Sequence, residues 1–328
     1  MIKAAVVGVG YLGTFHAEKY SRAKEAELVA VVDVDAERSR KLGRKLKAES
    51  LTDYRDLPSL GVQCASVVAD TRRHFEIAAW LLERGIDVLV EKPMCATVEE
   101  ARKLLAVAEE HGRILQVGHL ERFNPAFREM KKLLTRPWFF EVRRISPFSG
   151  RGIDVDVVLD LMIHDIDIVS HLVGRPLEKV EAVGVPVLTE SVDVANARLT
   201  FEGGAVANVS ASRAAFKSER TIRIFQPEVY ISLDYEKKKL KMYTKSGKPG
   251  LAGMPGIDVV EQKVEERDAL NDEITSFIEC VRTRTEPVVT GQDGLRALEL
   301  ADRIRSAFRE SMALMGERRE MARVGNAG

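Results

Sequence analysis

Three groups of residues in this sequence have types and spacings that could perform chemistry. The first is the glycine-rich segment Gly8-Val9-Gly10-Tyr11-Leu12-Gly13, which follows the apolar run 2–7. Glycine suits a tight turn at Gly8, close approach of a phosphate at Gly10, and close packing of a helix at Gly13. A helix that begins here presents N–H groups and a partial positive charge to an anion. The segment therefore predicts a bound dinucleotide.

The residues that follow support this prediction. A second apolar run, 28–32, ends in Asp33, twenty positions after Gly13. A carboxylate at this place accepts a hydrogen bond from the 2′-hydroxyl of a ribose and repels a 2′-phosphate, so NAD is favoured over NADP. Arg38 lies close enough in sequence to accommodate a phosphate instead. The alternative is an ordinary βα turn in which Asp33 is a solvated strand end.

The second group is Glu91-Lys92-Pro93, which follows the apolar strand 86–90. Ligands of open α/β sheets bind beyond the carboxyl ends of the strands, so Lys92 is expected to lie over a bound cofactor. A desolvated lysine there could stabilise a developing alkoxide or take part in proton transfer. A surface lysine at a strand end is the alternative. His119 follows strand 114–118 at the same edge of the sheet.

The third group lies on a helix predicted over 157–173, where Asp160, His164, Asp167 and His171 are spaced to share one face. The rest of this helix is apolar and therefore buried, so the polar stripe must line a cleft or find internal partners. In a cleft, Asp160 can orient His164, which then accepts a proton from a substrate hydroxyl. Asp167 and His171 are expected to be structural.

Two other interpretations of this helix remain open. One is a satisfied polar network without chemistry. The other is a metal site, because His and Asp four residues apart on a helix can share an ion. We expect no metal, since hydride transfer needs none. Arg122 and Arg151 could each clamp a phosphate or carboxylate of the substrate, or could be ordinary surface arginines.

The elements that must hold these residues fall into two regions. Up to about residue 119, short apolar strands alternate with amphipathic helices, a pattern typical of a doubly wound parallel α/β sheet. The expected strands are 2–7, 28–32, 64–69, 86–90 and 114–118, and the expected helices are 12–23, 36–46, 74–84 and 98–111. Asn124 before Pro125 predicts the start of another helix, to about 134.

After Pro137 the apolar and polar residues alternate, which predicts an antiparallel sheet. Its expected strands are 139–147, 177–187, 193–201, 205–213, 220–233 and 239–244. A loop rich in glycine and proline is predicted at 245–255, helices at 271–283 and 292–311, and a poorly ordered end at 317–328.

Composition excludes several classes of partner. The 328 residues suggest about two domains, and the 50 basic residues equal the 50 acidic ones, which argues against nucleic acid and membrane surfaces and for a small molecule. No apolar run approaches the ~20 residues of a membrane span. The first strand begins at once, without a signal peptide, so we expect a cytoplasmic protein. The three cysteines lack metal-ligand spacing and are expected to be buried thiols.

Taken together, the glycine segment with Asp33, the Glu91-Lys92-Pro93 motif and the Asp160-x-x-x-His164 pair with Asp167 resemble the Gfo/Idh/MocA family of sugar and polyol dehydrogenases. The motifs occur in the family's order, and the resemblance covers essentially the whole chain. The resemblance implies oxidation of a carbinol carbon with NAD or NADP as the hydride acceptor.

The resemblance also implies an architecture. An N-terminal NAD-binding Rossmann domain would occupy 1–120. A C-terminal α+β domain with a large open, mainly antiparallel sheet would occupy 121–328, with its last helix able to pack back on the first domain. This sheet commonly forms the oligomer interface in the family, which implies a homodimer or homotetramer.

Residue roles carry over by motif. Lys92 would contact the reacting hydroxyl, Asp160 would be its acidic partner, and His164 would be the general base. The implied cofactor-binding residues are Gly8, Gly10, Tyr11, Leu12, Gly13, Asp33, Thr71, Glu91, Lys92 and His119. The implied substrate-binding residues are Lys92, Arg122, Asn124, Arg151, Asp160 and His164.

Two positions depart from the family pattern. Met162 stands where the family usually has glycine, and Thr71-Arg72 replaces a common proline. Segments 118–125 and 160–165 resemble the subgroup that oxidises C3 of UDP-N-acetylglucosamine or its uronic acid. We therefore expect an NAD-dependent dehydrogenase of a UDP-sugar. An inositol or free-sugar dehydrogenase is one alternative, and a non-catalytic NAD-binding sensor is another.

Overall fold

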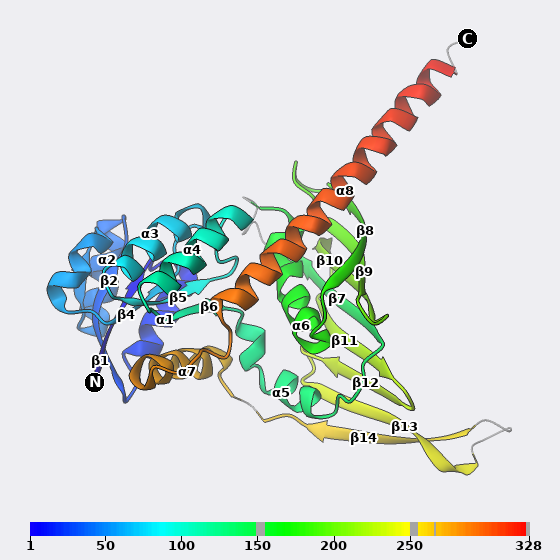
Figure 1. The fold of residues 1–328 in the computed structure, drawn as a ribbon, viewed down its shortest axis with the longest axis horizontal. Helices are drawn as coiled ribbons and strands as arrows, with labels where there is room; N and C mark the ends of the chain where they lie inside the picture. Colours follow the sequence, from blue (N-terminus) through cyan, green and yellow to red (C-terminus); the bar gives the residue numbers. More distant parts are fainter. Residues whose placement is uncertain (149–154, 250–254, 266, 326–328) are drawn as a thin grey trace. The chain divides into compact units, whose positions relative to one another are not determined.

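The computed structural model describes residues 1–148, 155–249, 255–265 and 267–325, and the chain forms two compact units (Figure 1). The first unit comprises Met1–Asn124 and Arg267–Leu298, and the second comprises Pro125–Glu266 and Glu299–Gly328. A boundary at residue 120 alone would place 267–298 in the second unit. These residues belong to the first because Ile274 and Phe277 are part of its buried core.

A six-stranded sheet forms the centre of the first unit, in the order β3-β2-β1-β4-β5-β6 with all neighbours parallel. Its strands are β1 (Ile2–Val7), β2 (Ala26–Val32), β3 (Glu49–Leu51), β4 (Cys64–Val67), β5 (Asp87–Glu91) and β6 (Leu115–Gly118). The order reverses direction at β1, as in a doubly wound fold. The predicted Rossmann sheet is confirmed, and β3 is an additional strand of only three residues.

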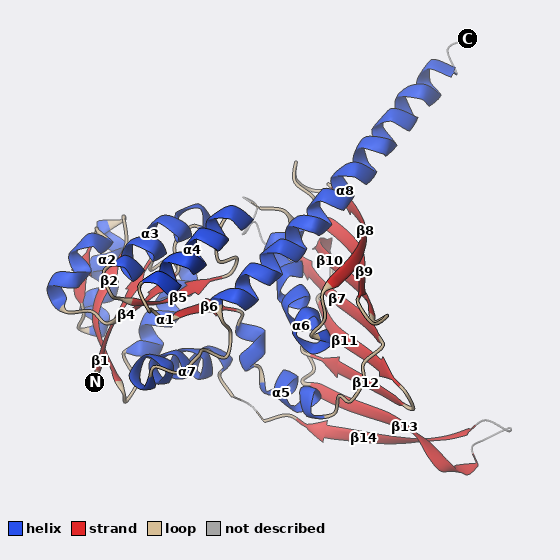
Figure 2. Cartoon of the chain, viewed as in Figure 1, coloured by secondary structure: helices blue, strands red, loops and turns tan. Residues whose placement is uncertain are grey.

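Helices cover both faces of this sheet, with α3 and α4 on one face and α1 and α7 on the other (Figure 2). The helices of the unit are α1 (Tyr11–Tyr20), α2 (Ala36–Leu46), α3 (Thr71–Glu83), α4 (Val98–Glu110) and α7 (Ala269–Thr283), with short 3-10 turns η1 (Tyr54–Leu60) and η2 (Leu120–Phe123). Helix α3 begins earlier than predicted because the Asp70 carboxylate caps it by accepting the Arg72 N–H.

An eight-stranded sheet forms the second unit, in the order β14-β13-β12-β11-β7-β10-β9-β8. Its strands are β7 (Phe139–Pro147), β8 (Leu177–Val185), β9 (Val194–Phe201), β10 (Val206–Ala215), β11 (Glu219–Gln226), β12 (Val229–Asp234), β13 (Lys239–Pro249) and β14 (Pro255–Lys263). Among the described strands of this second sheet, only the β7–β10 pair is parallel, so the prediction of a large, mainly antiparallel sheet is confirmed.

Two boundaries in this sheet differ from the prediction. The single strand expected at 220–233 is a hairpin, β11 and β12, whose turn contains Glu228 at a φ of 62°. Within the loop expected at 245–255, residues 245–249 belong to β13, which continues to Pro249, and β14 begins at Pro255. Residues 250–254 lie outside the described residues.

The helices of the second unit are α5 (Pro125–Lys132), the π-helical turn η3 (Val158–Met162) and α6 (Ile163–Val173), and α8 (Gly291–Gly325) continues from the first unit into the second. The predicted helix over 157–173 thus has one wide turn at its start, and it ends at Gly174 as expected. Helix α8 continues through most of 317–328, which was expected to be poorly ordered; 326–328 lie outside the described residues. No described helix has the length and apolar character needed to cross a membrane.

Candidate active site

The glycine segment forms the β1–α1 loop, and its three glycines have different surroundings. Gly8 has a φ of 86°, and a Cβ there would lie 2.7 Å from the backbone of Val68 and Ala69. A Cβ on Gly13 would collide with the carbonyl oxygen of Gly8, whereas one on Gly10 would meet nothing within 4 Å. The loop therefore has a tight turn, a close helix contact and an open side for a ligand, as the glycine spacing predicts.

Asp33 joins the end of β2 to the glycine loop. Its side chain is 6% exposed, and its Oδ2 accepts a hydrogen bond from the Val9 N–H at 2.9 Å. Its Oδ1 accepts the Asp35 N–H at 2.9 Å, and Arg38 Nη1 lies 3.2 Å from both oxygens. The carboxylate thus fixes the conformation of the loop. It is also the negatively charged group that the sequence predicts to lie beside a ribose.

A cavity of about 600 Å³ opens beside this carboxylate and is lined by Gly8, Gly10, Asp33 and Arg38 among others. At one side of the loop α1 begins with the exposed residues Tyr11 and Leu12. Glycine backbone, a helix N-terminus and an acceptor beside a cavity are the features that a dinucleotide requires. These residues fit a nicotinamide dinucleotide.

Lys92 follows β5 directly and is half-buried. Its own N–H donates to Glu91 Oε2 at 3.2 Å, and the bond from Lys92 to Pro93 is cis. His119, at the end of the neighbouring strand β6, is 1% exposed. The prediction that strand ends bring these residues to one edge of the sheet agrees with the parallel β5–β6 pairing.

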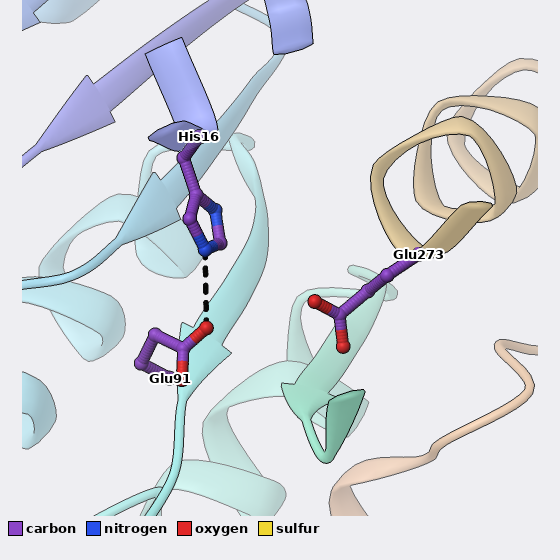
Figure 3. A group of neighbouring side chains, drawn as sticks. All are labelled: His16, Glu91 and Glu273. Atoms are coloured by element: carbon purple, nitrogen blue, oxygen red, sulfur yellow. Dashed lines mark hydrogen bonds and ion pairs between the residues drawn. The ribbon is translucent and has the colours of Figure 1, made fainter. Parts of the chain in front are cut away.

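A buried polar cluster that the sequence did not indicate includes Glu91, the residue before Lys92 (Figure 3). His16 Nε2 on α1 lies 3.1 Å from Glu91 Oε1, and the Glu273 side chain on α7 points toward the pair. The ligating atoms of the three side chains lie within 4.8 Å of one another. Neither Glu273 oxygen has a hydrogen-bond partner among the described residues, and burial raises the pKa of this carboxyl well above its usual range.

The other predicted substrate residues of the first unit have structural contacts. Arg122 is 4% exposed, and its guanidinium lies 3.7 Å from Asp293 Oδ1. Asn124 Nδ2 donates to Glu121 Oε2 at 3.1 Å. Arg151 lies outside the described residues.

In the second unit, η3 carries Asp160 and the first turn of α6 carries His164, both half-buried. Asp167 is 2% exposed, and His171 Nε2 lies 2.8 Å from Lys131 Nζ. Asp160, His164 and His171 are thus half-buried, while Asp167 is fully buried. π-helical turns occur frequently at functional sites.

Ion pairs hold this segment on both sides. Asp165, next to His164, accepts two hydrogen bonds from Arg144 on β7, at 2.8 and 3.0 Å, and both side chains are buried. Before the π turn, Asp156 accepts the N–H groups of the first turn and is paired at 2.6 Å with Arg305 on α8. These partners are far away in sequence, so no local pattern could indicate them.

A parallel sheet with a glycine loop and an acidic residue at the end of β2, joined to a second unit with an Asp–His pair on a buried helix, defines a two-domain oxidoreductase with a dinucleotide cofactor. Residues 2–119 match the model of the oxidoreductase family with an NAD-binding Rossmann fold, and residues 127–231 match the GFO/IDH/MocA C-terminal domain. The chain belongs to the GFO/IDH/MocA family of oxidoreductases.

Similar proteins include dehydrogenases with different substrates. A UDP-N-acetylglucosamine 3-dehydrogenase from Acidithiobacillus ferrooxidans is 34% identical, covering 93% of this chain and 97% of its own length. Its solved structure superposes with a TM-score of 0.88 over the same shares of both chains. A myo-inositol 2-dehydrogenase from Thermotoga maritima is 26% identical, covering 95% of this chain and 98% of its own.

The buried Glu273 carboxyl gives a prediction about pH and stability. Its pKa is raised in the folded state, so the folded protein holds a proton that the unfolded chain releases above the ordinary glutamate value of 4.5. Stability therefore falls as pH rises from 4.5 toward the folded-state pKa. In Glu273→Gln this contribution is absent, and the decrease in Tm between pH 5 and about pH 8 should be smaller than in the wild type.

Thermal unfolding at several pH values measures this difference. Glu279→Gln is the matched control, because Glu279 lies on the same helix with its side chain 49% exposed and should leave the pH dependence nearly unchanged. Equal slopes for Glu273→Gln and the wild type would show that the carboxyl is ionised in the folded protein.

Proposed function

We propose that this oxidoreductase is an NAD-dependent dehydrogenase that oxidises a secondary hydroxyl of a sugar, C3 of UDP-N-acetylglucosamine or of a related UDP-sugar, to a keto sugar. The observation that carries the proposal is the 34% identity across 93% of the chain with a UDP-N-acetylglucosamine 3-dehydrogenase. The presence of Lys92, Asp160 and His164 supports catalysis over a sensor role, because a sensor needs no proton-transfer groups.

In the proposed mechanism, each residue has one task. His164 accepts the proton of the substrate hydroxyl, and Asp160 stabilises the resulting imidazolium. Lys92 donates a hydrogen bond to the same oxygen and stabilises the negative charge that develops there. NAD, when bound, supplies the hydride acceptor. His164 is half-buried, which leaves part of the residue accessible to a substrate.

The cofactor proposal is NAD rather than NADP. It rests on Asp33, whose buried carboxylate is fixed by two backbone N–H groups and cannot turn away from a 2′-phosphate without breaking them. Arg38 pairs with this carboxylate and offsets part of its charge. The proposed cofactor contacts are those of the glycine loop, Asp33, Thr71, Glu91, Lys92 and His119.

The proposed substrate contacts are Lys92, Arg122, Asn124, Arg151, Asp160 and His164. An inositol dehydrogenase is the second candidate, because two relatives at 26% identity are named as myo- and scyllo-inositol 2-dehydrogenases. A UDP-sugar carries a diphosphate and an inositol does not, so a requirement for the diphosphate separates the two candidates.

We also propose that a second copy of the chain covers the open face of the eight-stranded sheet. Four aromatic rings lie side by side on adjacent strands, at Phe139, Phe225, Tyr230 and Tyr243, with successive centroids 5.5, 4.8 and 4.9 Å apart. Each neighbouring pair is directly opposite in the strand register. A flat, half-buried aromatic surface of this kind suits association with an identical surface.

The catalytic assignment predicts the effect of single substitutions. Lys92→Ala and His164→Ala should each lower kcat by about 10²–10⁴-fold, the usual contribution of a positioned acid, base or oxyanion donor. NADH formation is measured by absorbance with UDP-N-acetylglucosamine, free sugars and inositols, and the keto position of the product is determined. His171→Ala is the control on the same helix and should retain activity.

Other outcomes select the other candidates. Oxidation of myo-inositol without oxidation of any UDP-sugar would identify the inositol dehydrogenase. Tight NAD binding with no turnover of the whole substrate panel would identify the sensor. Near wild-type turnover in His164→Ala would refute the proposed base.

Cofactor preference provides a second prediction. Asp33→Asn should raise the ratio of kcat/KM with NADP to kcat/KM with NAD by about tenfold, because it removes a like-charge repulsion of about 1–4 kcal/mol at close range. Asp35→Asn is the matched control, since Asp35 also contacts Arg38 but its side chain is 47% exposed. Equal use of NADP and NAD by the wild type would contradict the assignment.

The proposed interface predicts the oligomeric state. Light scattering should give the wild type the mass of a dimer or tetramer, and Tyr230→Glu should shift it toward the monomer by burying a charge without a partner. Tyr243→Phe retains the ring stack and should retain the assembly. A wild-type monomer at all concentrations would contradict the proposal.

A further inference from the structure

Both neighbours of Lys92 in the chain contact a buried histidine. Glu91 is hydrogen-bonded to His16 of α1 at 3.1 Å, and the carbonyl oxygen of Pro93 lies 3.0 Å from Nδ1 of His74 on α3. The two histidines are 0% and 1% exposed. We propose that His16 and His74 are positioning residues that together fix the backbone carrying Lys92; this inference rests on the catalytic role proposed above for Lys92.

On the Glu91 side, the carboxylate is held from three directions. One oxygen contacts His16 and the other accepts the Lys92 N–H at 3.2 Å. A Cβ on Gly118 of the adjacent strand would lie 2.8 Å from the same carboxyl group, so the carboxylate fills the space above that glycine. Figure 3 shows the His16–Glu91 contact between α1 and the end of β5. The carboxylate therefore transmits the position of His16 to the Lys92 amide.

On the Pro93 side, His74 connects two loops. Its Nδ1 faces the Pro93 carbonyl, and its Nε2 faces the Ala69 carbonyl at 3.0 Å. Ala69 in turn lies close to the Gly8 turn of the cofactor loop, where a Cβ on Gly8 would be 2.7 Å from its backbone nitrogen. Burial lowers the pKa of His74, so the ring is neutral and has one N–H to donate. An N–H on Nδ1 donates to the Pro93 carbonyl, and an N–H on Nε2 donates to the Ala69 carbonyl.

The two histidines lie on helices that begin beside the cofactor loop. His16 lies on the helix that begins at the glycine loop, and His74 lies on the helix that begins at Thr71, a proposed cofactor contact. The same two helices therefore border the cofactor site and determine where Lys92 stands. A displacement of about 1 Å in a catalytic group costs about 10²-fold in rate, so a common support for cofactor and lysine has a direct effect on kcat.

Glu273 introduces a competing explanation for part of the cluster. His16, Glu91 and Glu273 together offer the ligand types of a divalent cation site. A metal-bound histidine normally donates its second ring N–H to an acceptor. His16 Nδ1 has no such acceptor in the described part of the chain. Burial raises the pKa of Glu273, so this carboxyl carries a proton and needs no cation to offset a charge. We therefore interpret the His16–Glu91 contact as a hydrogen bond and retain a bound metal as an outcome of the test.

Asparagine and glutamine substitutions separate positioning from simple burial. The amide nitrogen of Asn occupies roughly the place of the histidine Nδ1, and that of Gln the place of Nε2. His16→Gln should therefore keep the contact to Glu91 and His16→Asn should lose it. At the other site the order is reversed, since His74→Asn keeps the contact to Pro93 and His74→Gln keeps only the contact to Ala69.

We expect His16→Gln and His74→Asn to retain kcat within about threefold of the wild type. His16→Asn and His74→Gln should lower kcat by about 10–100-fold, with little change in the substrate KM or NADH affinity. In His16→Asn the Tm should fall as well, because the buried Glu91 carboxylate loses its partner. His111→Gln, at an exposed helix end of the same unit, is the control and should behave as wild type. A general loss of packing would instead lower Tm in all four variants and would not reverse between the two sites.

Each other result overturns a defined part of the proposal. Equal kcat values for Asn and Gln at both sites, while Lys92→Ala is inactive, would refute the positioning role and leave the proposed function intact. An active Lys92→Ala would refute the role of Lys92 itself. One equivalent of zinc or manganese in the purified protein, measured by mass spectrometry and lost in His16→Asn, would replace the hydrogen-bond interpretation with a metal site.

Discussion

The first unit depends on the close approach of α1 to the end of β1, which is possible only because residue 13 is glycine. Any side chain there would collide with the backbone of the loop before it. With α1 at this distance, its later turns reach strands beyond β1. His16 contacts Glu91 on β5, and the Tyr20 hydroxyl lies 3.0 Å from Ser66 on β4. One missing side chain therefore determines the shape of the cofactor loop and also the polar contacts that continue from it.

Local signals in the sequence predict those parts of the fold that are determined locally. The capping box at Thr97 and the helix end at Gly174 occur where the residue types require them. The hairpin at 226–229 was missed because its positive-φ position is Glu228 rather than glycine, so a continuous alternation suggested one strand. The packing of α7 in the first unit depends on apolar contacts between segments that are far apart in the chain, so no local pattern indicates it.

The same distinction applies to the candidate site. Glycine spacing and the strand ends were sufficient to find the loop, Asp33 and Lys92. His16 and His74 could be read only as packing residues, because their contacts lie 75 and 19 residues away in sequence. Asp165 gave no signal either, because its partner Arg144 lies on a strand, β7, 21 residues earlier in the sequence. Sequence patterns identified the residues proposed to react, and long-range pairing identified the residues that hold them.

The two units hold their proposed reacting residues in the same way. Lys92 and His164 are half-buried, and each is adjacent in sequence to a fully buried carboxylate, Glu91 and Asp165. A buried carboxylate is tolerated only with a partner, and removing the partner of such a pair costs about 3–5 kcal/mol, so its geometry is well determined. The neighbouring residues Lys92 and His164 therefore have a fixed backbone without being fully buried themselves. They remain able to exchange a proton or meet a substrate, which full burial would prevent.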